Sequence, residues 1–401
     1  MITASPKIAE AQLRGAAAIR AIFDAEYYLR ANPDVGAAGL DPLRHYLDIG
    51  WAEGRNPSPL FDSDYYLDSN ADIYAAGLNP LVHYVSNGAR EGRNPHPLFD
   101  TKFYTETNAD LGAANPLAHY LHIGAREHRQ PNLLFDAPWY VRQHPEAGLN
   151  PLAHYAEHGL ARQLSPHPLF DGAYYLAQHP DVAAANMNPL AHYLLRGHLE
   201  VRNPHPLFDT QWYSARNPDI AEAKVSPLAH YVRHGARLQA SPHPLFDTAW
   251  YLEQYKAEVG DADALVHYIT SGAAALRQPN PLFDAAFYVR QNPDAAANPL
   301  AHYAEHGLTR RLSPHPLFDG AFYLDKYPDV AAAGMNPLTH YLLRGAEEVR
   351  DPNPEFDAAW YVRTNETKGE TPLAHFLQNN IKPAGHQTIR RGVHGNAEII
   401  A

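Results

Sequence analysis

The chain of 401 residues contains no cysteine and only three methionines. Without cysteine the protein has no disulfide framework, no cysteine-based zinc site and no thiol nucleophile. Disulfides are also what most directly connects a sequence with an oxidising compartment. Cysteine usage therefore leaves both the cytoplasm and the cell exterior open.

Long apolar runs are absent as well. No stretch of about 18 apolar residues occurs, which is the length that a membrane-spanning helix needs. The N-terminus, MITASPKIAEAQLRG, lacks the basic region followed by an apolar region that marks a signal peptide. We therefore expect a soluble protein without a transmembrane segment, either cytoplasmic or exported without an N-terminal signal peptide.

Positive charge is in deficit, and catalytic motifs are missing. The chain has 32 basic and 44 acidic residues, for a formal charge of −12. Because nucleic-acid affinity rests on clustered Lys and Arg, no nucleic-acid partner is expected. Neither G-x-S-x-G nor a phosphate-binding loop is present, nor a G-x-G-x-x-G in the strand–helix context of a dinucleotide fold. We predict no enzyme, no catalytic residue and no cofactor.

A tandem repeat fills most of the chain. The pair Phe-Asp recurs every 35–38 residues and predicts ten modules of about 37 residues. They begin at residues 23, 61, 99, 135, 170, 208, 246, 283, 318 and 356. A second landmark, L-x-H-Y or once L-x-H-F, places a histidine in each module: His45, His83, His119, His154, His192, His230, His267, His302, His340 and His375.

The spacing of the two landmarks separates a tolerant segment from a rigid one. From Asp to His within a module the interval is 18–21 residues, whereas from His to the next Asp it is always 17. The variable part is typical of a surface loop or a short frayed helix. The constant part crosses the module boundary, and we expect it to behave as one rigid piece.

The Phe-Asp landmark predicts the start of a helix. In SPHPLFDGAYYL, residues 165–176, Asp171 is a good N-cap, and Phe170 and Tyr175 occupy the two positions that form a hydrophobic staple. All ten modules keep the Phe and the Tyr. With two further repeated aromatic positions they account for 40 of the 44 aromatic residues, which we interpret as a repeated core.

A second helix is predicted at N-P-L-x-H-Y. An N-cap residue opens it in every module, from Asp41 to Thr371, and proline follows at N1 except at Ala264. Five residues after the histidine stands glycine, or once Asn380, which we interpret as a left-handed C-terminal cap. Between the two helices, N-P-D-V-A-A-A-G predicts a short third helix with its own Asn cap and glycine stop.

These short helices require stacking. Since a module of this size cannot bury enough apolar surface alone, the sequence predicts an all-α tandem-repeat array, a solenoid or rod, with two or three short helices per module. Residues 1–22 are predicted to supply an N-terminal capping helix, residues 23–382 the array, and residues 383–401 a loose C-terminal tail.

The histidines admit two interpretations. One His and one Asp per module fall short of the three or four ligands of a metal site, so we expect the L-x-H-Y histidines to tie their helix to backbone groups of the adjoining loop. The alternative is a metal site at the histidine pairs spaced i, i+4. The candidates are His154 with His158, His230 with His234, and His302 with His306.

A second group of histidines lies next to prolines in the boundary segment. Their replacement by serine or asparagine in other modules predicts that the fold does not need them and that some are exposed. They are His96, His167, His205, His243 and His315, and their replacements are Ser58, Asn132, Asn280 and Asn353.

The consensus F-D-x-x-Y-Y-L-x-x-N-P-D-V-A-A-A-G-x-N-P-L-x-H-Y-L-x-x-G-x-x-E-G-R-x-P resembles a bacterial tandem repeat found beside glycosyltransferase domains and in large surface or secreted proteins. The resemblance covers about 360 of the 401 residues, and Phe61–Leu98 is among its cleanest copies. It implies a noncatalytic scaffold or binding protein linked to cell-surface polysaccharide or the envelope, with a protein or polysaccharide ligand. No glycosyltransferase domain is present, so that activity is not implied.

The histidine content also predicts a response to acid. If all 25 histidines were protonated, the formal charge would change from −12 to +13. Self-association or solubility should therefore change between about pH 7 and pH 5. Light scattering over that range tests this prediction, and an unchanged particle size would contradict it.

Overall fold

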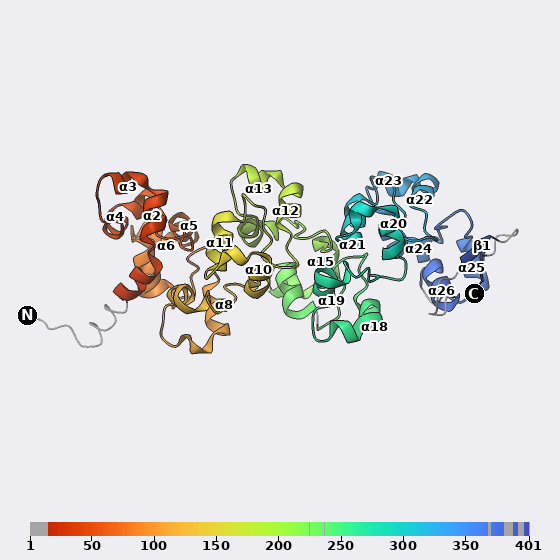
Figure 1. Ribbon diagram of the computed structural model, residues 1–401, viewed down its shortest axis with the longest axis horizontal. Helices are drawn as coiled ribbons and strands as arrows, with labels where there is room; N and C mark the ends of the chain where they lie inside the picture. The colour runs from red at the N-terminus through yellow and green to blue at the C-terminus, as the bar shows by residue number, and fades with distance from the viewer. Residues whose placement is uncertain are drawn as a thin grey trace, which may run out of the picture. The chain divides into compact units, whose positions relative to one another are not determined.

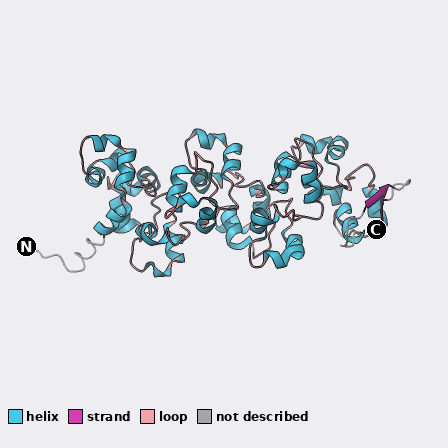
Figure 2. Cartoon of the chain, viewed as in Figure 1, coloured by secondary structure: helices cyan, strands magenta, loops and turns pink. Residues whose placement is uncertain are grey.

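The computed structural model describes residues 15–223, 225–235, 237–367, 370–380, 388–391 and 397–400. The chain divides into two compact units, Met1–Pro204 and His205–Ala401. Both are built from short helices joined by loops (Figures 1 and 2). The expected all-α class with repeated, similar helix pairs is confirmed, and among the described residues no helix is both long and apolar enough to cross a membrane.

Each Phe-Asp landmark opens a first helix, usually of seven residues. The Asp side chain accepts a hydrogen bond from the N–H three residues later, as at Asp171, where Tyr174 N lies 3.0 Å from Oδ1. The predicted cap is confirmed at all ten landmarks. These helices are α2 (Ala25–Ala31), α5 (Ser63–Ser69), α8 (Thr101–Thr107), α10 (Ala137–Gln143), α12 (Gly172–Gln178), α15 (Thr210–Arg216), α18 (Thr248–Val259), α20 (Ala285–Gln291), α22 (Gly320–Lys326) and α25 (Ala358–Thr364).

Each L-x-H-Y landmark lies in a second helix, which starts at the expected proline or at Ala264. The second helices are α4 (Pro42–Asp48), α7 (Pro80–His83), α9 (Pro116–His119), α11 (Pro151–His158), α14 (Pro189–His192), α17 (Pro227–His230), α19 (Ala264–His267), α21 (Pro299–His306), α24 (Pro337–Glu348) and α26 (Pro372–Asn380). Five of them continue as π-helical turns: η2 (Tyr84–Gly88), η4 (Tyr120–Gly124), η6 (Tyr193–Gly197), η7 (Tyr231–Gly235) and η8 (Tyr268–Gly272). After α4, the 3₁₀ turn η1 (Gly50–Glu53) follows.

Nine of the ten predicted caps of the second helices accept a backbone hydrogen bond. Thr371 differs, because its hydroxyl is buried without a partner among the described residues. There the N–H of Leu373 donates to Tyr341 Oη at 3.0 Å. The cap prediction is therefore wrong at Thr371.

Short linking helices lie between most first and second helices, as predicted. They are α3 (Pro33–Ala37), α6 (Ala71–Ala75), α13 (Pro180–Ala184), α16 (Asp219–Ala223) and α23 (Pro328–Ala332), with single 3₁₀ turns at η3 (Ala109–Leu111), η5 (Pro145–Ala147) and η9 (Pro293–Ala295). Figure 1 shows α3 beside α2 and α4.

The Asn cap predicted for the linking helix is wrong. Asn32 makes no side-chain cap bond, and its Nδ2 donates instead to the carbonyl of Tyr28 at 2.8 Å. The asparagine therefore closes the end of the first helix, whose last carbonyls lack helical partners. The predicted glycine stop is confirmed at Gly39, where φ is +64°.

The core consists of closely packed aromatic rings. Phe61, Tyr66 and Tyr84 are fully buried, with ring centroids 5.7–6.0 Å apart and the two tyrosines edge to face. Equivalent Phe–Tyr contacts occur at all ten landmarks, which confirms the staple. The fourth repeated aromatic is not core: Tyr65 is half-buried, and Trp360 is 44% exposed.

The boundary segments contain short turns and hold backbone bonds between successive landmarks. Asp136 N–H donates to the carbonyl of Pro166 at 3.0 Å, so the start of one first helix is tied to the segment that leads to the next. Eight further Asp–Pro bonds of this kind occur. In the first unit Arg30 also pairs with Glu157 at 3.1 Å, so α2 contacts α11 although 127 residues separate the two side chains.

The sequence predictions for the two ends of the chain can be compared with the described residues. Residues 15–22 are helical, while residues 1–14 of the predicted capping helix lie outside the described residues. In the C-terminal tail, β1 (Thr388–Arg391) pairs antiparallel with β2 (Ala397–Ile400), with Thr388 opposite Ile400. The β-branched residues of these strands favour extended pairing, and the prediction of a loose tail stays a prediction.

Backbone strain is concentrated where the second helices end. Val201 adopts a φ of 57° and is 50% exposed, whereas the equivalent residue three repeats earlier is Gly92 at 72°. A left-handed conformation costs an L-residue about 1–2 kcal/mol, and glycine avoids this cost. Glycine loses more chain entropy on folding, however, which cancels about 0.5–1 kcal/mol of the gain.

We therefore predict that Val201→Gly raises the free energy of unfolding by about 0.5–1 kcal/mol. Urea unfolding followed by circular dichroism measures the change. Leu199→Gly, two residues away at a negative φ, serves as the control and should destabilise the protein. Equal effects of the two substitutions would contradict this account.

Candidate functional site

A hydrogen bond between a tyrosine and a histidine joins every first helix to its second helix. In the second repeat Tyr66 Oη lies 2.9 Å from His83 Nδ1, and the tyrosine is fully buried. The same bond, at 2.8–2.9 Å, recurs at all ten L-x-H-Y or L-x-H-F histidines. The structural role expected for these histidines is present, but their partner is a side chain and not the backbone of a loop.

At a histidine whose second ring nitrogen faces a carboxylate, the donor and the acceptor of the Tyr–His bond can be assigned. Asp219 Oδ2 lies 3.0 Å from His230 Nε2, so Nε2 carries a proton and Nδ1 accepts from the hydroxyl of Tyr213. Burial lowers the pKa of His83, and the neighbouring Arg93 adds to the effect. Burial likewise raises the pKa of the Tyr66 hydroxyl, which keeps it a neutral donor.

In five repeats the glycine after the L-x-H-Y histidine permits this contact and does not cap the helix. Gly88 is not among the residues with positive φ, and a Cβ placed on it would collide with Tyr66 Oη. The same collision would occur at Gly50, Gly124, Gly197 and Gly272. The left-handed residue comes four positions later, as at Gly92. The predicted glycine C-cap is therefore wrong, because the need for close approach selects glycine here.

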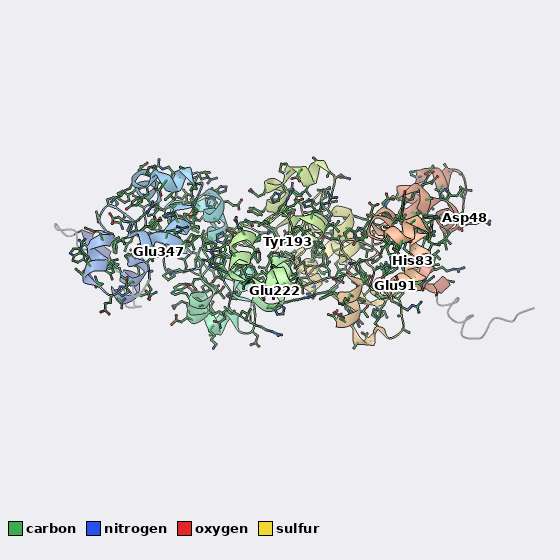
Figure 3. The ribbon with its side chains drawn as sticks, turned by 180° about the vertical axis from the view of Figure 1, so that it is seen from behind. Asp48, His83, Glu91, Tyr193, Glu222 and Glu347 are labelled. Carbon is green, nitrogen blue, oxygen red and sulfur yellow. The ribbon has the colours of Figure 1, made fainter. Side chains whose placement is uncertain are left out.

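An ion pair encloses the exposed side of the same cluster. Arg93 donates through both terminal nitrogens to the two carboxylate oxygens of Asp72, each at 2.8 Å, and also to Asn70. Hydrogen bonding to Arg93 lowers the pKa of Asp72 to about 2. Figure 3 labels His83 and Glu91, and the latter pairs with Arg93 Nε at 2.6 Å. The guanidinium therefore connects the end of the second helix with the linking helix.

The sequence analysis missed this ion pair, although both letters stand in the consensus, as Asp in N-P-D and Arg in E-G-R. Corresponding pairs are Asp34–Arg55, Asp110–Arg129, Glu146–Arg162, Asp181–Arg202, Glu258–Arg277, Asp294–Arg310 and Asp329–Arg350. In the sixth repeat Ala240 replaces the arginine, and the carboxylate of Asp219 turns to His230 instead.

The candidate metal pairs do lie side by side. Ring centroids are 4.8 Å apart for His154 and His158, 5.3 Å for His230 and His234, and 4.7 Å for His302 and His306. Within the described ranges no group of three or more His, Cys, Asp or Glu side chains is arranged to hold a metal ion.

Cations already stand next to two of these pairs. Arg310 Nη1 lies 3.2 Å from His302 Nε2, and Arg162 Nη1 lies 3.3 Å from His154 Nε2. In each case Nδ1 is engaged by a tyrosine. A metal ion at either histidine would have to displace an arginine that also pairs with a carboxylate.

The boundary histidines have a structural role, contrary to expectation. His167 is only 7% exposed, and its Nδ1 accepts the N–H of Leu169 at 3.0 Å. The other four make the same bond to the residue two positions on. Their replacement by asparagine misled the prediction, because Asn132 Oδ1 accepts the equivalent N–H at 2.8 Å. Histidine and asparagine are interchangeable here because they present an acceptor at the same place.

No protein-family model, no curated protein and no solved structure matches this chain. The resemblance to a bacterial surface-associated repeat therefore stays a prediction.

The fit between glycine and tyrosine predicts a large effect of a single methyl group. Gly88→Ala should destabilise the protein by about 1–3 kcal/mol, since the added carbon forces Tyr66 away from His83. Urea unfolding measures the loss. Gly36→Ala, whose added carbon would meet Leu29 at an ordinary 3.6 Å, should be neutral or stabilising. A loss in both variants of equal size would contradict the role given to Gly88.

Proposed function

We propose that the protein is a noncatalytic scaffold or binding protein, a solenoid or rod of ten repeats that binds a protein or polysaccharide in bacterial envelope biology. The observation that carries this proposal is the use of the repeated polar side chains. The Asp caps, the Tyr–His bonds and the Arg–carboxylate pairs all join parts of the repeats to one another. Groups bound in this way are occupied in holding the fold, which favours a scaffold over a row of active sites.

The linking segments supply a surface that is free to vary. In the first unit Leu40 is 49%, Tyr74 72%, Leu78 46% and Leu149 66% exposed, and all four lie between a first helix and its second helix. These segments are also the ones whose length changes from repeat to repeat. Exposed apolar and aromatic side chains on a rigid frame are typical of binding surfaces. We assign the ligand contact to this linking edge.

The array itself is supported by two features. Backbone bonds of the Asp136–Pro166 kind tie each repeat to the next within a unit. The ion pair between Arg30 and Glu157 adds a contact between repeats three apart in the first unit. Contacts between neighbouring repeats, such as these backbone bonds, are what a helical repeat array requires. The envelope context rests on the resemblance of the consensus alone.

A histidine-rich metal- or pH-responsive surface protein is the second candidate. The close pairing of His154 with His158 favours it, whereas Arg162 beside His154 opposes it. Calorimetric titration with zinc and calcium separates the candidates. Tight stoichiometric binding that is lost in His158→Ala would favour the metal-responsive protein over the scaffold.

The linking edge gives the scaffold proposal a direct test. On an array of bacterial envelope polysaccharides, we expect binding by the wild-type chain and at least a tenfold loss, ~1.4 kcal/mol, in a Tyr74→Ala, Leu78→Ala variant. Ile49→Ala removes an apolar side chain that is 53% exposed but lies at the end of a second helix, and should leave binding unchanged. A blank array would reject the polysaccharide branch, and equal losses in both variants would reject the linking edge.

A further inference from the structure

Nine short turns mark the boundaries between successive repeats. In each, the first residue accepts the N–H of a phenylalanine three positions later, as between His167 and Phe170 at 2.9 Å. We call these the crossing turns and name each by its first residue: Ser58, His96, Asn132, His167, His205, His243, Asn280, His315 and Asn353. The carbonyl just before each of these residues accepts the N–H of a preceding Asp cap. A crossing turn therefore holds one repeat boundary.

Asparagine closes a crossing turn with groups that do not titrate. Asn132 Oδ1 accepts the N–H of Leu134 at 2.8 Å, and Nδ2 donates to the carbonyl of Leu98 in the preceding turn at 2.7 Å. Asn280 and Asn353 repeat both bonds. Neither bond depends on pH, because the amide stays neutral.

Histidine closes the same turn only while it is neutral. At His167 the ring nitrogen Nδ1 must hold a lone pair to accept the N–H of Leu169. Protonation places a hydrogen on that nitrogen, so that two donors face each other and the bond is lost. The ring is also buried, 7% exposed at His167 and 5% at His205, so the charge gains little from water.

The charged neighbours of His96, His167, His243 and His315 are few. Asp136 faces His167, Asp284 faces His315, and both Asp209 and His205 face His243. Burial outweighs the attraction of these carboxylates and lowers the pKa of His96, His167, His243 and His315 to about 4. At His96 burial is the sole cause.

We propose that the five histidine turns are acid-sensitive joints, at which protonation breaks the turn and loosens the boundary between repeats, while the serine and asparagine turns hold. The sign follows from the neutral folded state. These histidines contribute their full stability above the unfolded pKa of about 6.5, and the contribution is lost as the pH falls from there toward about 4. Acid therefore loosens the repeat boundaries that carry a histidine turn and leaves the other boundaries intact.

The acid response proposed for the histidine turns differs from the response expected from the change in net charge. A change in formal charge acts on the whole surface, whereas a joint opens at residues 96, 167, 205, 243 and 315 and not at residue 132. The chain supplies its own matched control, because asparagine already occupies three equivalent positions.

Hydrogen–deuterium exchange of the full chain at pH 7 and pH 5, corrected for the intrinsic exchange rate, tests the proposal. The opening equilibrium of the peptide over residues 165–170 should rise about twentyfold from pH 7 to pH 5, while the peptide over residues 131–135, which ends before Asp136, keeps its protection. In His167→Asn the rise at 165–170 should disappear, and the other histidine turns should still open. Unchanged protection at pH 5, or equal opening at the Asn132 turn, would overturn the proposal.

The reciprocal variant guards against a simple folding defect. Asn132→His should transfer acid sensitivity to the peptide over residues 131–135, with no change at pH 7 in circular dichroism. If this peptide stays protected at pH 5 in the folded variant, the histidine is not the trigger and the proposal fails.

Discussion

The hydrogen bond between a buried tyrosine hydroxyl and a histidine ring is the interaction on which each repeat depends. It joins two helices that are too short to be stable alone, and it does so next to a glycine that has no side chain to keep them apart. The aromatic packing of Phe61, Tyr66 and Tyr84 places the hydroxyl where the histidine can meet it. The Arg93–Asp72 pair then covers the exposed edge of the histidine.

The crossing turns extend this local order along each unit. A constant interval of 17 residues from His to Asp contains the end of one second helix, the crossing turn and the next cap. Within that interval the backbone bond to the preceding Asp and the crossing turn involve adjacent residues, which constrains the length of the segment there. The linking segment carries no such double constraint, which explains why its length varies.

Local rules predicted much of the fold. Asp171 as a cap, Phe170 with Tyr175 as a staple and proline at the start of the second helices all act within a few residues, so they are readable from the sequence. The errors have one origin. Gly88 and His167 were assigned by the usual preference of their residue type, left-handed caps for glycine and exposure for a replaceable histidine, whereas neighbours more distant in the chain decide both.

The sequence by itself therefore determined the repeat, the helix starts, the all-α class and the absence of cysteine chemistry. Only the tertiary structure decided which polar groups meet. The Tyr–His partners are 14–17 residues apart, on opposite sides of a linking segment, and the Arg93–Asp72 partners are 21 apart, with Asp72 in the linking helix. Such contacts depend on how the helices pack. Across a loop of variable length, the packed core sets the direction of each side chain, and the number of residues between two side chains does not.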